Sequence, residues 1–306
     1  MRFCVDSRWS AVRVGVTVRR GARYWRRLGS TLAVCGMFSA SLGLASAQGL
    51  SWEQLAEGMV VTTWDPGTRC DGQVPRLFMV KIDPERFRFS TYHFRDEGLP
   101  APLTIKEWQQ RTRASVLFNA GLFREDFSYM GWLFKNGRSL GSKRHPLWKG
   151  LFVAEPVGAG LPKARVLDLA VEHFSPDDPA YHEAAQSLML LDRSGKPRVR
   201  RTEQRAHQTV VVEDRAGSLV VIKTAGEVTM WELAVCLQEG LPGIAHAMAM
   251  DGGASSDLLI SSELPGVREA GRDPSLWQRL VDGNGVEHIT LPAVIGVAAR
   301  DVGRQR

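Results

Sequence analysis

The sequence predicts an α+β fold, a single domain in which a mainly antiparallel, mixed sheet is packed by a few helices. Three observations lead to this prediction. Short apolar segments with alternating pattern recur along the chain, several of them are joined by turn residues, and only two longer segments combine helical spacing with an N-terminal cap. The chain lacks the regular strand–helix alternation of a doubly wound sheet, and it has no repeat of about 20 to 50 residues.

The first elements lie between residues 51 and 93. Residues 51–60 are expected to form a short helix or turn, because their large apolar residues recur at helical spacing. Residues 75–82 and 86–93 both alternate between apolar and polar side chains, as strands with one buried face do. The turn residues Asp83-Pro84-Glu85 stand between these two segments, so the sequence predicts that they form a β-hairpin.

A capped helix and a buried strand come next. Residues 104–112 are predicted to form an amphipathic helix, with Thr104 as N-cap and Glu107 at the third helical position, the two residues of a capping box. Residues 114–123 contain an apolar run that reaches Asn119 and then continues with small residues. We therefore expect a buried strand that ends at a polar side chain.

The middle of the chain is predicted to be rich in strands. Asn136-Gly137 is a strong signal for a hairpin turn inside residues 131–138. The other elements expected here are a strand at 150–154, a strand within 164–173, a brief helical turn at 181–185 and a compact apolar strand at 186–192. The cationic run with Arg198, Arg200 and Arg201 is interpreted as a solvated loop.

The last elements are the clearest. Residues 209–213 and 218–222 flank a turn and predict a hairpin, and residues 229–239 predict a helix with its own capping box. A buried strand over 245–250 follows directly, and residues 293–299 supply a final buried strand.

The N-terminal segment is typical of a secretory signal peptide. Residues 1–27 carry eight arginines against one acid, an apolar stretch follows over 28–44, and Ala45-Ser46-Ala47 has the form of a cleavage site. The apolar stretch is short and diluted with Gly and Ser, which argues against the alternative, a retained membrane anchor. We expect a signal peptide at 1–47 and an exported domain at 48–306, periplasmic or secreted, without a stable membrane span after cleavage.

The basic character of the chain belongs to this leader. The whole sequence carries +6 from 39 basic and 33 acidic residues, but the leader alone carries +7 from eight basic residues and one acidic residue. The remaining 31 basic and 32 acidic residues give −1. The charge therefore offers no support for nucleic acid as a partner.

Two cysteines remain after the leader, Cys70 and Cys236. An exported protein permits a disulfide between them. Cys236, however, falls on the apolar face of a predicted helix, so an unpaired buried thiol is expected at least as strongly. The sequence has no CxxC, no HExxH and no Cys/His cluster, so no structural zinc site is predicted.

The strand at 245–250 ends on a carboxylate. Asp251 is followed by Gly252 and Gly253, which permit a tight turn and close approach of a ligand, and then by the hydroxyls of Ser255 and Ser256. A simple strand-ending turn is the alternative interpretation.

Three segments together extend this interpretation. They are Asn119-Ala120-Gly121-Leu122-Phe123, then Gln186-Ser187 with Arg205 after it, and then Asp251-Gly252-Gly253-Ala254-Ser255. In order and spacing they resemble the phosphodiester glycosidase family. That family includes the enzyme that removes N-acetylglucosamine from a phosphodiester to uncover mannose 6-phosphate, and many exported bacterial proteins. The resemblance covers about residues 76–299, the expected core of the domain. Ala120 and Ala254 stand where the family has glycine.

The resemblance implies hydrolysis of a sugar-1-phosphodiester in the cell envelope. Asp251 would be the carboxylate that acts as base or stabilises the positive charge at the anomeric carbon, and His207 would be its acid–base partner. Arg205 would bind phosphate through its guanidinium fork.

Other residues would complete this predicted site. The backbone amides of Gly252 and Gly253 would form an anion nest. The remaining predicted contacts with substrate are Asn119, Gly121, Gln186, Ser255 and Ser256.

Two other classes of function remain open on the sequence. One is a non-catalytic periplasmic glycan-binding protein, and the other is a phosphodiesterase that cleaves at phosphorus with a divalent cation on Asp251. No cofactor or metal is required by the residues themselves. The partner expected in each case is a glycan or a small sugar phosphate.

Overall fold

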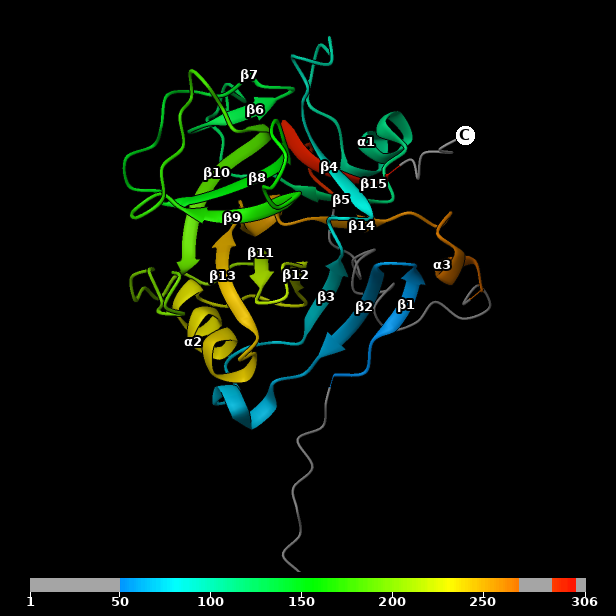
Figure 1. The fold of residues 1–306 in the computed structure, drawn as a ribbon. Helices are drawn as coiled ribbons and strands as arrows, with labels where there is room; N and C mark the ends of the chain where they lie inside the picture. Colours follow the sequence, from blue (N-terminus) through cyan, green and yellow to red (C-terminus); the bar gives the residue numbers. More distant parts are fainter. Residues whose placement is uncertain (1–49, 270–287, 301–306) are drawn as a thin grey trace, which may run out of the picture. The chain divides into compact units, whose positions relative to one another are not determined.

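The computed structural model describes residues 50–269 and 288–300, which all belong to the unit formed by Gln48–Arg306. The predicted signal peptide at 1–47 lies outside the described residues. The described part of the chain is predominantly β, with strands in two sheets and a few short helices (Figure 1).

The strands are short and follow one another closely along the chain. In order they are β1 (Glu53–Ala56), β2 (Met59–Trp64), β3 (Leu77–Ile82), β4 (Phe87–His93), β5 (Val116–Asn119), β6 (Leu133–Lys135), β7 (Arg138–Ser139), β8 (Gly150–Pro156), β9 (Ala164–Asp168), β10 (Tyr181–Leu191), β11 (Thr209–Asp214), β12 (Leu219–Thr224), β13 (Ile244–Ala249), β14 (Leu258–Ile260) and β15 (Ala293–Ala299). The helices are α1 (Ile105–Thr112), α2 (Met230–Gly240) and α3 (Pro265–Glu269), with 3-10 turns η1 (Gly67–Cys70) and η2 (Gly253–Ser255).

The strands form two sheets. The larger follows the order β1-β2-β3-β12-β11-β13-β10-β6-β7, with β8 also paired to β10 and β9 paired to β8. The smaller follows the order β14-β5-β15-β4. Among the described strands every pair is antiparallel, so the mainly antiparallel arrangement is confirmed. The expectation of one mixed sheet is wrong, because so many twisted strands are better accommodated in two packed sheets.

The two sheets pack face to face, and the larger sheet is buried on both sides. In β3, Phe78, Val80 and Ile82 belong to the cluster between the sheets, while Leu77 and Met79 belong to the cluster beneath α2. This division follows the period of two along a strand. The almost uninterrupted apolar run of β3 is thus explained by burial on both faces.

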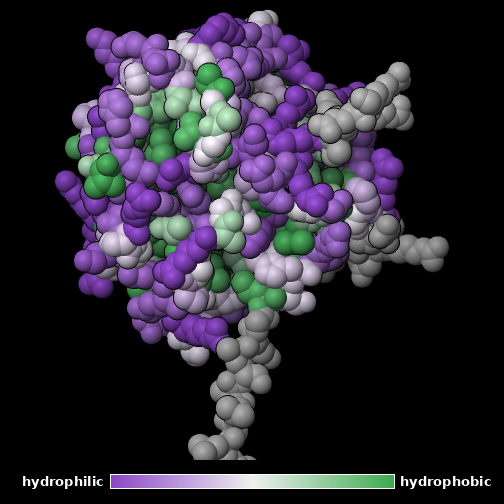
Figure 2. All heavy atoms as spheres, in the orientation of Figure 1, coloured by the Kyte–Doolittle hydropathy of each residue, from purple (hydrophilic) through white to green (hydrophobic). Residues whose placement is uncertain are grey.

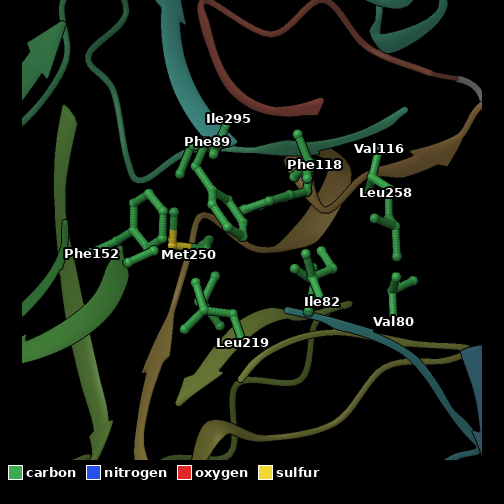
Figure 3. Close-up of a cluster of buried hydrophobic side chains, with 14 of the residues drawn as sticks. Val80, Ile82, Phe89, Val116, Phe118, Phe152, Leu219, Met250, Leu258 and Ile295 are labelled. Carbon is green, nitrogen blue, oxygen red and sulfur yellow. The ribbon is translucent and has the colours of Figure 1, made fainter. Parts of the chain in front are cut away.

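The cluster between the sheets anchors the end of β13. Phe118 and Ile295 of the smaller sheet point toward Leu219 of the larger one, and Met250 packs into the same cluster (Figure 3). All four side chains are almost completely buried. Burying a side chain of this size contributes about 1.5–3 kcal/mol. Met250 therefore fixes the chain immediately before Asp251.

Both predicted long helices are confirmed, together with their capping boxes. Thr104 caps α1 with Glu107 at the third position, and Thr229 caps α2 with Glu232. Helix α1 packs on the smaller sheet, and α2 packs on the outer face of the larger one. The predicted hairpins at 131–138 and 209–222 are also confirmed, as β6–β7 and β11–β12.

The short helix predicted as one possibility for residues 51–60 is not present. These residues form the hairpin β1–β2 instead of a helix, with Ala56 paired to Met59. Gly58, at a φ of +84°, provides the left-handed residue of the two-residue turn. The helical spacing of Leu55 and Met59 is accidental, since the hairpin folds both into the core.

The predicted hairpin of residues 75–82 and 86–93 is wrong as well. Both strands exist, but β3 pairs with β2 and β12 in the larger sheet, whereas β4 pairs with β15 in the smaller sheet. The turn at Asp83-Pro84-Glu85 carries the chain from one sheet to the other. A turn signal is local and does not specify which strands become hydrogen-bonded partners.

Residues 181–185 form the first half of a strand rather than a helical turn. Strand β10 runs without a break from Tyr181 to Leu191, and β8 pairs with it from Tyr181 to Ser187. Pairing along its length overrides the weak local preference. Strand β14 and helix α3 have no counterpart in the prediction.

A disulfide joins Cys70 of η1 to Cys236 of α2. The expectation of an unpaired thiol is wrong, although Cys236 is buried on the helix as predicted. The bond closes a long loop, since the two cysteines are 166 residues apart in the sequence. In the chain-entropy account, such a crosslink stabilises the fold by restricting the unfolded chain.

The face of the molecule shown in Figure 2 is mainly polar. On the face in Figure 2, hydrophilic residues predominate and hydrophobic ones form small separate patches. In the described part of the chain, none of the helices has the length and apolar character needed to cross a membrane.

Candidate functional site

A pocket of about 670 Å³ opens at Asp251, two residues after the end of β13. Its wall combines apolar and polar side chains, as ligand pockets commonly do. The polar lining consists of Asp251, Gly252, Gly253, Arg198, Arg200, Thr202, Gln204 and Gln208. The apolar lining consists of Leu122, Leu147, Trp148, Leu188, Val199, Ala206, Met230 and Met250.

Asp251 is the carboxylate of this pocket, and no other acidic residue of the described chain lines it. Burial raises the pKa of Asp251, while hydrogen bonds from the Ser255 side chain and the Gly252 amide lower it less. The Gly252 amide lies 3.0 Å from Oδ1 of Asp251. A half-buried carboxylate with a raised pKa is a stronger base than a solvated one.

The register of the sheet brings Gln208 close to Asp251. Ala249 of β13 is paired with Val210 of β11 on one side and with Leu188 of β10 on the other. Beyond Ala249, the amide of Met250 still donates to the carbonyl of Thr209 at 2.8 Å, whereas the amide of Asp251 donates to the carbonyl of Ala120 at 3.1 Å. Gln208, which precedes Thr209, lines the pocket together with Asp251, and Gln186 does not.

The side chain of Gln186 is enclosed by Trp132, which precedes β6, and by the segment between β7 and β8. Its Oε1 accepts hydrogen bonds from the amides of Trp132 and His145, and its Nε2 donates to the carbonyls of His145 and Trp148. The side chain is completely buried. All four hydrogen bonds are used inside the protein, so the predicted contact between Gln186 and substrate is not supported. Its role is to hold the loop that carries Trp148.

Asn119 also faces inward. Its Oδ1 accepts from the amide of Asp257 at 3.0 Å, and its Nδ2 donates to the carbonyls of Asp251 and Ala120 at 2.7 and 3.2 Å. The residue is 1% exposed. Asn119 and Asp251 therefore do converge, as predicted, but the amide of Asn119 binds the backbone of the Asp251 segment instead of projecting into the pocket.

Tyr129 connects these inward-facing groups. Its hydroxyl donates to the carbonyl of Gln186 and accepts from the amide of Gly121, both at 2.9 Å. A side chain at Gly121 would collide with this hydroxyl and would bring Cβ within 2.7 Å of the Gln186 carbonyl. Gly121 is thus required for close packing. We call Asn119, Tyr129 and Gln186 the support layer.

The predicted anion nest is wrong. The amide of Gly252 is occupied by Oδ1 of Asp251, and the amide of Gly253 donates to the carbonyl of His207 at 2.8 Å. Both donors of the turn are therefore used internally. Both glycines still line the pocket and keep it open, because they have no side chains.

The two serines after the turn are buried and do not line the pocket. Ser255 hydrogen-bonds to Asp251, and the hydroxyl of Ser256 lies 2.9 Å from that of Thr209. The predicted contact of these hydroxyls with phosphate is not supported. Ser255 positions the carboxylate, and Ser256 ties the turn to β11.

Arg205 points away from the pocket. Its guanidinium group binds both carboxylate oxygens of Glu232, at 3.1 and 2.9 Å, and the carbonyls of Gln73 and Glu227. The prediction that it shares a site with Asp251 is therefore wrong. His207 is also absent from the lining, and its Nδ1 lies 3.4 Å from the Thr224 carbonyl.

Arg205 and His207 are excluded from the pocket by the alternation of side chains in the extended segment that enters β11. Gln204, Ala206 and Gln208 line the pocket, while Arg205 and His207, which have the other parity, do not. The sequence predicts that side chains alternate between two faces along this segment. It does not predict which face lines the pocket, because that depends on how β11 pairs with β13.

Two arginines of the predicted solvated loop are exposed, as expected, and they also line the pocket. Arg198 and Arg200 lie in its wall, on the loop that follows β10. Arg198 forms a salt bridge with Asp192 at 3.4 Å, and neither arginine pairs with Asp251. A guanidinium group at this place can bind a phosphate through two parallel hydrogen bonds.

One acidic residue, two arginines and an apolar wall that includes Trp148 therefore line the same pocket. In the described part of the chain, no three His, Cys, Asp or Glu side chains are grouped so that they could hold a metal ion.

Comparisons with known proteins find a matching family and similar folds. The sequence model of the phosphodiester glycosidase family matches residues 112–287, more than half of the chain. A comparison with curated protein sequences finds no match.

Two solved structures share the fold. The catalytic domain of zebrafish N-acetylglucosamine-1-phosphodiester alpha-N-acetylglucosaminidase has a TM-score of 0.55 and 12% identity, over 83% of this chain and 87% of that one. A hypothetical protein from Synechocystis has a TM-score of 0.52 and 14% identity, over 84% of this chain and 65% of that one. At these identities the likeness concerns the fold.

Proposed function

Because the chain belongs to the phosphodiester glycosidase family, we propose that it hydrolyses a sugar-1-phosphodiester, with Asp251 as the catalytic carboxylate. One observation carries the proposal. Asp251, whose pKa is raised by burial, lies in the same pocket as Arg198 and Arg200. This is the pairing that the reaction needs, since one end of the substrate becomes positively charged while the other end is anionic.

In the proposed reaction, water attacks the anomeric carbon while the bond from that carbon to the phosphate oxygen breaks. The electron pair of that bond leaves with the phosphate. Asp251 accepts a proton from the water, and its negative charge stabilises the positive charge that develops on the sugar. A stronger base accepts this proton more readily, so the raised pKa of Asp251 favours the step.

Glycosidases commonly use a second carboxyl group as an acid, and the lining offers no other carboxyl group among the described residues. A phosphate monoester is already a good leaving group, so it does not need protonation by an acid. It needs cations that bind the negative charge as it develops, and Arg198 and Arg200 provide them. His207 is not required as an acid in this scheme.

Isotope labelling tests the proposal directly. The first substrate is an N-acetylglucosamine-1-phosphodiester, the compound named for the zebrafish neighbour, followed by phosphodiesters of other sugars. In water labelled with oxygen-18, cleavage at carbon places the label in the released sugar. Label in the phosphate would contradict the proposal and favour the phosphodiesterase alternative. Binding without turnover of any substrate would favour the glycan-binding alternative.

Removal of metal ions provides a second test. The proposed chemistry uses only side chains of the chain itself, so treatment with a chelator is expected to leave the rate unchanged. Loss of activity that returns with a divalent cation would instead support cation-assisted cleavage.

We also propose that the protein acts outside the cytoplasm, in the periplasm or as a secreted protein. The signal-peptide pattern at residues 1–47 supports this location, and so does the disulfide between Cys70 and Cys236, because such bonds persist in oxidising compartments. Fractionation of cells that produce the full chain tests the location. Recovery of the full-length protein in the cytoplasm would contradict it.

A further inference from the structure

A buried hydrogen-bond acceptor beside Asp251 has no partner. The side chain of Gln208 lines the pocket and is 2% exposed, and its Oε1 forms no hydrogen bond with any residue that the structure describes. Buried polar atoms are paired in most cases, because an unpaired one loses its hydration without compensation. An exception in the wall of a pocket points to a ligand.

The orientation of this amide is determined by its surroundings. Nε2 donates to the carbonyls of Ala206 at 3.3 Å and Val228 at 3.5 Å. Both of these groups can only accept, so the nitrogen must face them and the oxygen must face the other way. The free atom is therefore an acceptor and not a donor.

Gly252 packs against Oε1 of Gln208. A Cβ atom at Gly252 would lie 3.0 Å from Oε1 of Gln208 and 3.0 Å from the carbonyl oxygen of His207. Gly252 directly follows Asp251, and all three residues, Gln208, Asp251 and Gly252, line the pocket. The unpaired acceptor thus lies beside the turn that carries the carboxylate.

This part of the pocket differs in character from the part that contains Arg198 and Arg200. Near Asp251 it presents two acceptors, the carboxylate and Oε1 of Gln208, which repel phosphate oxygens and attract O–H or N–H groups. The arginines present only donors and positive charge. A sugar phosphate therefore fits in one orientation, with its donor-rich ring at Asp251 and its phosphate at the arginines.

We propose that Gln208 is a specificity-determining residue, whose Oε1 accepts a hydrogen bond from a hydroxyl or amide N–H of the sugar ring and thereby orients the anomeric carbon toward Asp251. This inference rests on the proposed function for the identity of the ligand. It goes beyond that function by assigning the orientation of the substrate and the residue that selects it.

The test compares wild type with Gln208→Met on a panel of sugar-1-phosphodiesters, in which one ring hydroxyl or the acetamido group is removed at a time. Methionine keeps the length of the side chain and removes the acceptor. The carbonyls of Ala206 and Val228 keep their backbone hydrogen bonds to each other's amides, so the fold is expected to persist. Gln73→Met, at an exposed glutamine outside the pocket, is the matched control.

The expected result has two parts. Gln208→Met lowers kcat/KM for the complete substrate by roughly tenfold to a hundredfold, because the donor of the sugar is left unpaired. When one particular hydroxyl or amide donor is removed from the substrate, kcat/KM of wild type falls by a similar factor. The kcat/KM of Gln208→Met does not fall further with that substrate. The inference would be overturned if wild type and Gln208→Met had equal kcat/KM values for the complete substrate and lost equal factors when each donor was removed.

Gly252→Ala provides a second variant that keeps the glutamine at position 208. Its Cβ would lie 3.0 Å from Oε1 and crowd that atom, so the same donor should lose its effect. Calorimetric binding of the same panel separates this inference from the proposed function. If no substrate is turned over, the proposed function fails, while selective loss of one donor's contribution to Kd in Gln208→Met would still support the role of Gln208. Equal Kd values throughout would overturn it.

Discussion

The pocket wall and the support layer behind it differ in how their polar atoms are used. In the support layer, the side-chain amides of Asn119 and Gln186 are bonded to backbone groups on both their oxygen and nitrogen atoms. In the wall, Gln208 leaves its oxygen unpaired, and Asp251 keeps a carboxylate in the cavity. The two glutamines, Gln186 and Gln208, thus have opposite roles.

This difference teaches that a polar residue at the end of a buried strand can serve the fold or a ligand, and that its unused hydrogen bonds decide between the two. The wall should respond to substitution with a loss of activity at little change in stability. The support layer should respond with a loss of stability first.

Asp251→Asn should show the largest effect. Removal of the base is expected to lower kcat/KM by about a hundredfold to ten-thousandfold, because asparagine cannot accept the proton of the attacking water. Initial rates on a sugar-1-phosphodiester and a thermal unfolding curve measure both aspects. Wild-type turnover in a folded Asp251→Asn protein would remove Asp251 from the mechanism.

Gln186→Leu should affect mainly the stability of the fold. It leaves two amides and two carbonyls around the 131–148 segment without their side-chain partner, at a total cost on the order of 3 kcal/mol. Urea unfolding measures the loss, with Gln73→Leu as a surface control. An unchanged midpoint for Gln186→Leu would mean that the support layer does not support the fold.

The pH dependence tests the state of Asp251. Burial raises its pKa, so kcat/KM should rise with pH through a midpoint above the ordinary aspartate value, and should fall about tenfold per pH unit below that midpoint. A midpoint at or below the ordinary value would contradict the burial of the carboxylate.

The same shift predicts a change in stability of known sign. A carboxyl group whose pKa is raised on folding stabilises the folded state below its unfolded pKa, and this contribution is lost as the pH rises through the folded pKa. Asp251→Asn should therefore be at least as stable as wild type at neutral pH, with any advantage disappearing in acid. Thermal unfolding at several pH values measures this difference.

The smallest expected effects on kinetics are those of substitutions at Arg200 and Arg205, which should differ from each other. Arg200→Gln is expected to raise KM about tenfold, because a phosphate loses a charged donor. Arg205→Gln should leave kcat and KM within about twofold, and should cost no more than about 1 kcal/mol for its partly exposed ion pair with Glu232. Equal losses from both substitutions would mean that the phosphate reaches Arg205.

The parts of the fold that the sequence predicted correctly depend on interactions between near neighbours. A capping box joins residues three positions apart, as at Thr104 and Glu107, and the β11–β12 hairpin depends on the turn between its strands. The false hairpin at 75–93 has an equally good local pattern. Its strands belong to different sheets because partners far along the chain, β12 and β15, compete for them.

The sequence by itself determined that apolar strands lead to Asn119 and Asp251, and that small residues follow each of them. It could not determine that Asn119 faces inward, that the glycine amides are already occupied, or that Gln208 rather than Arg205 flanks the carboxylate. The alternation of side chains along a strand is a local property, so it divides residues into two faces. Only the packing of the two sheets, which depends on distant parts of the chain, decides which face borders the pocket and which is buried.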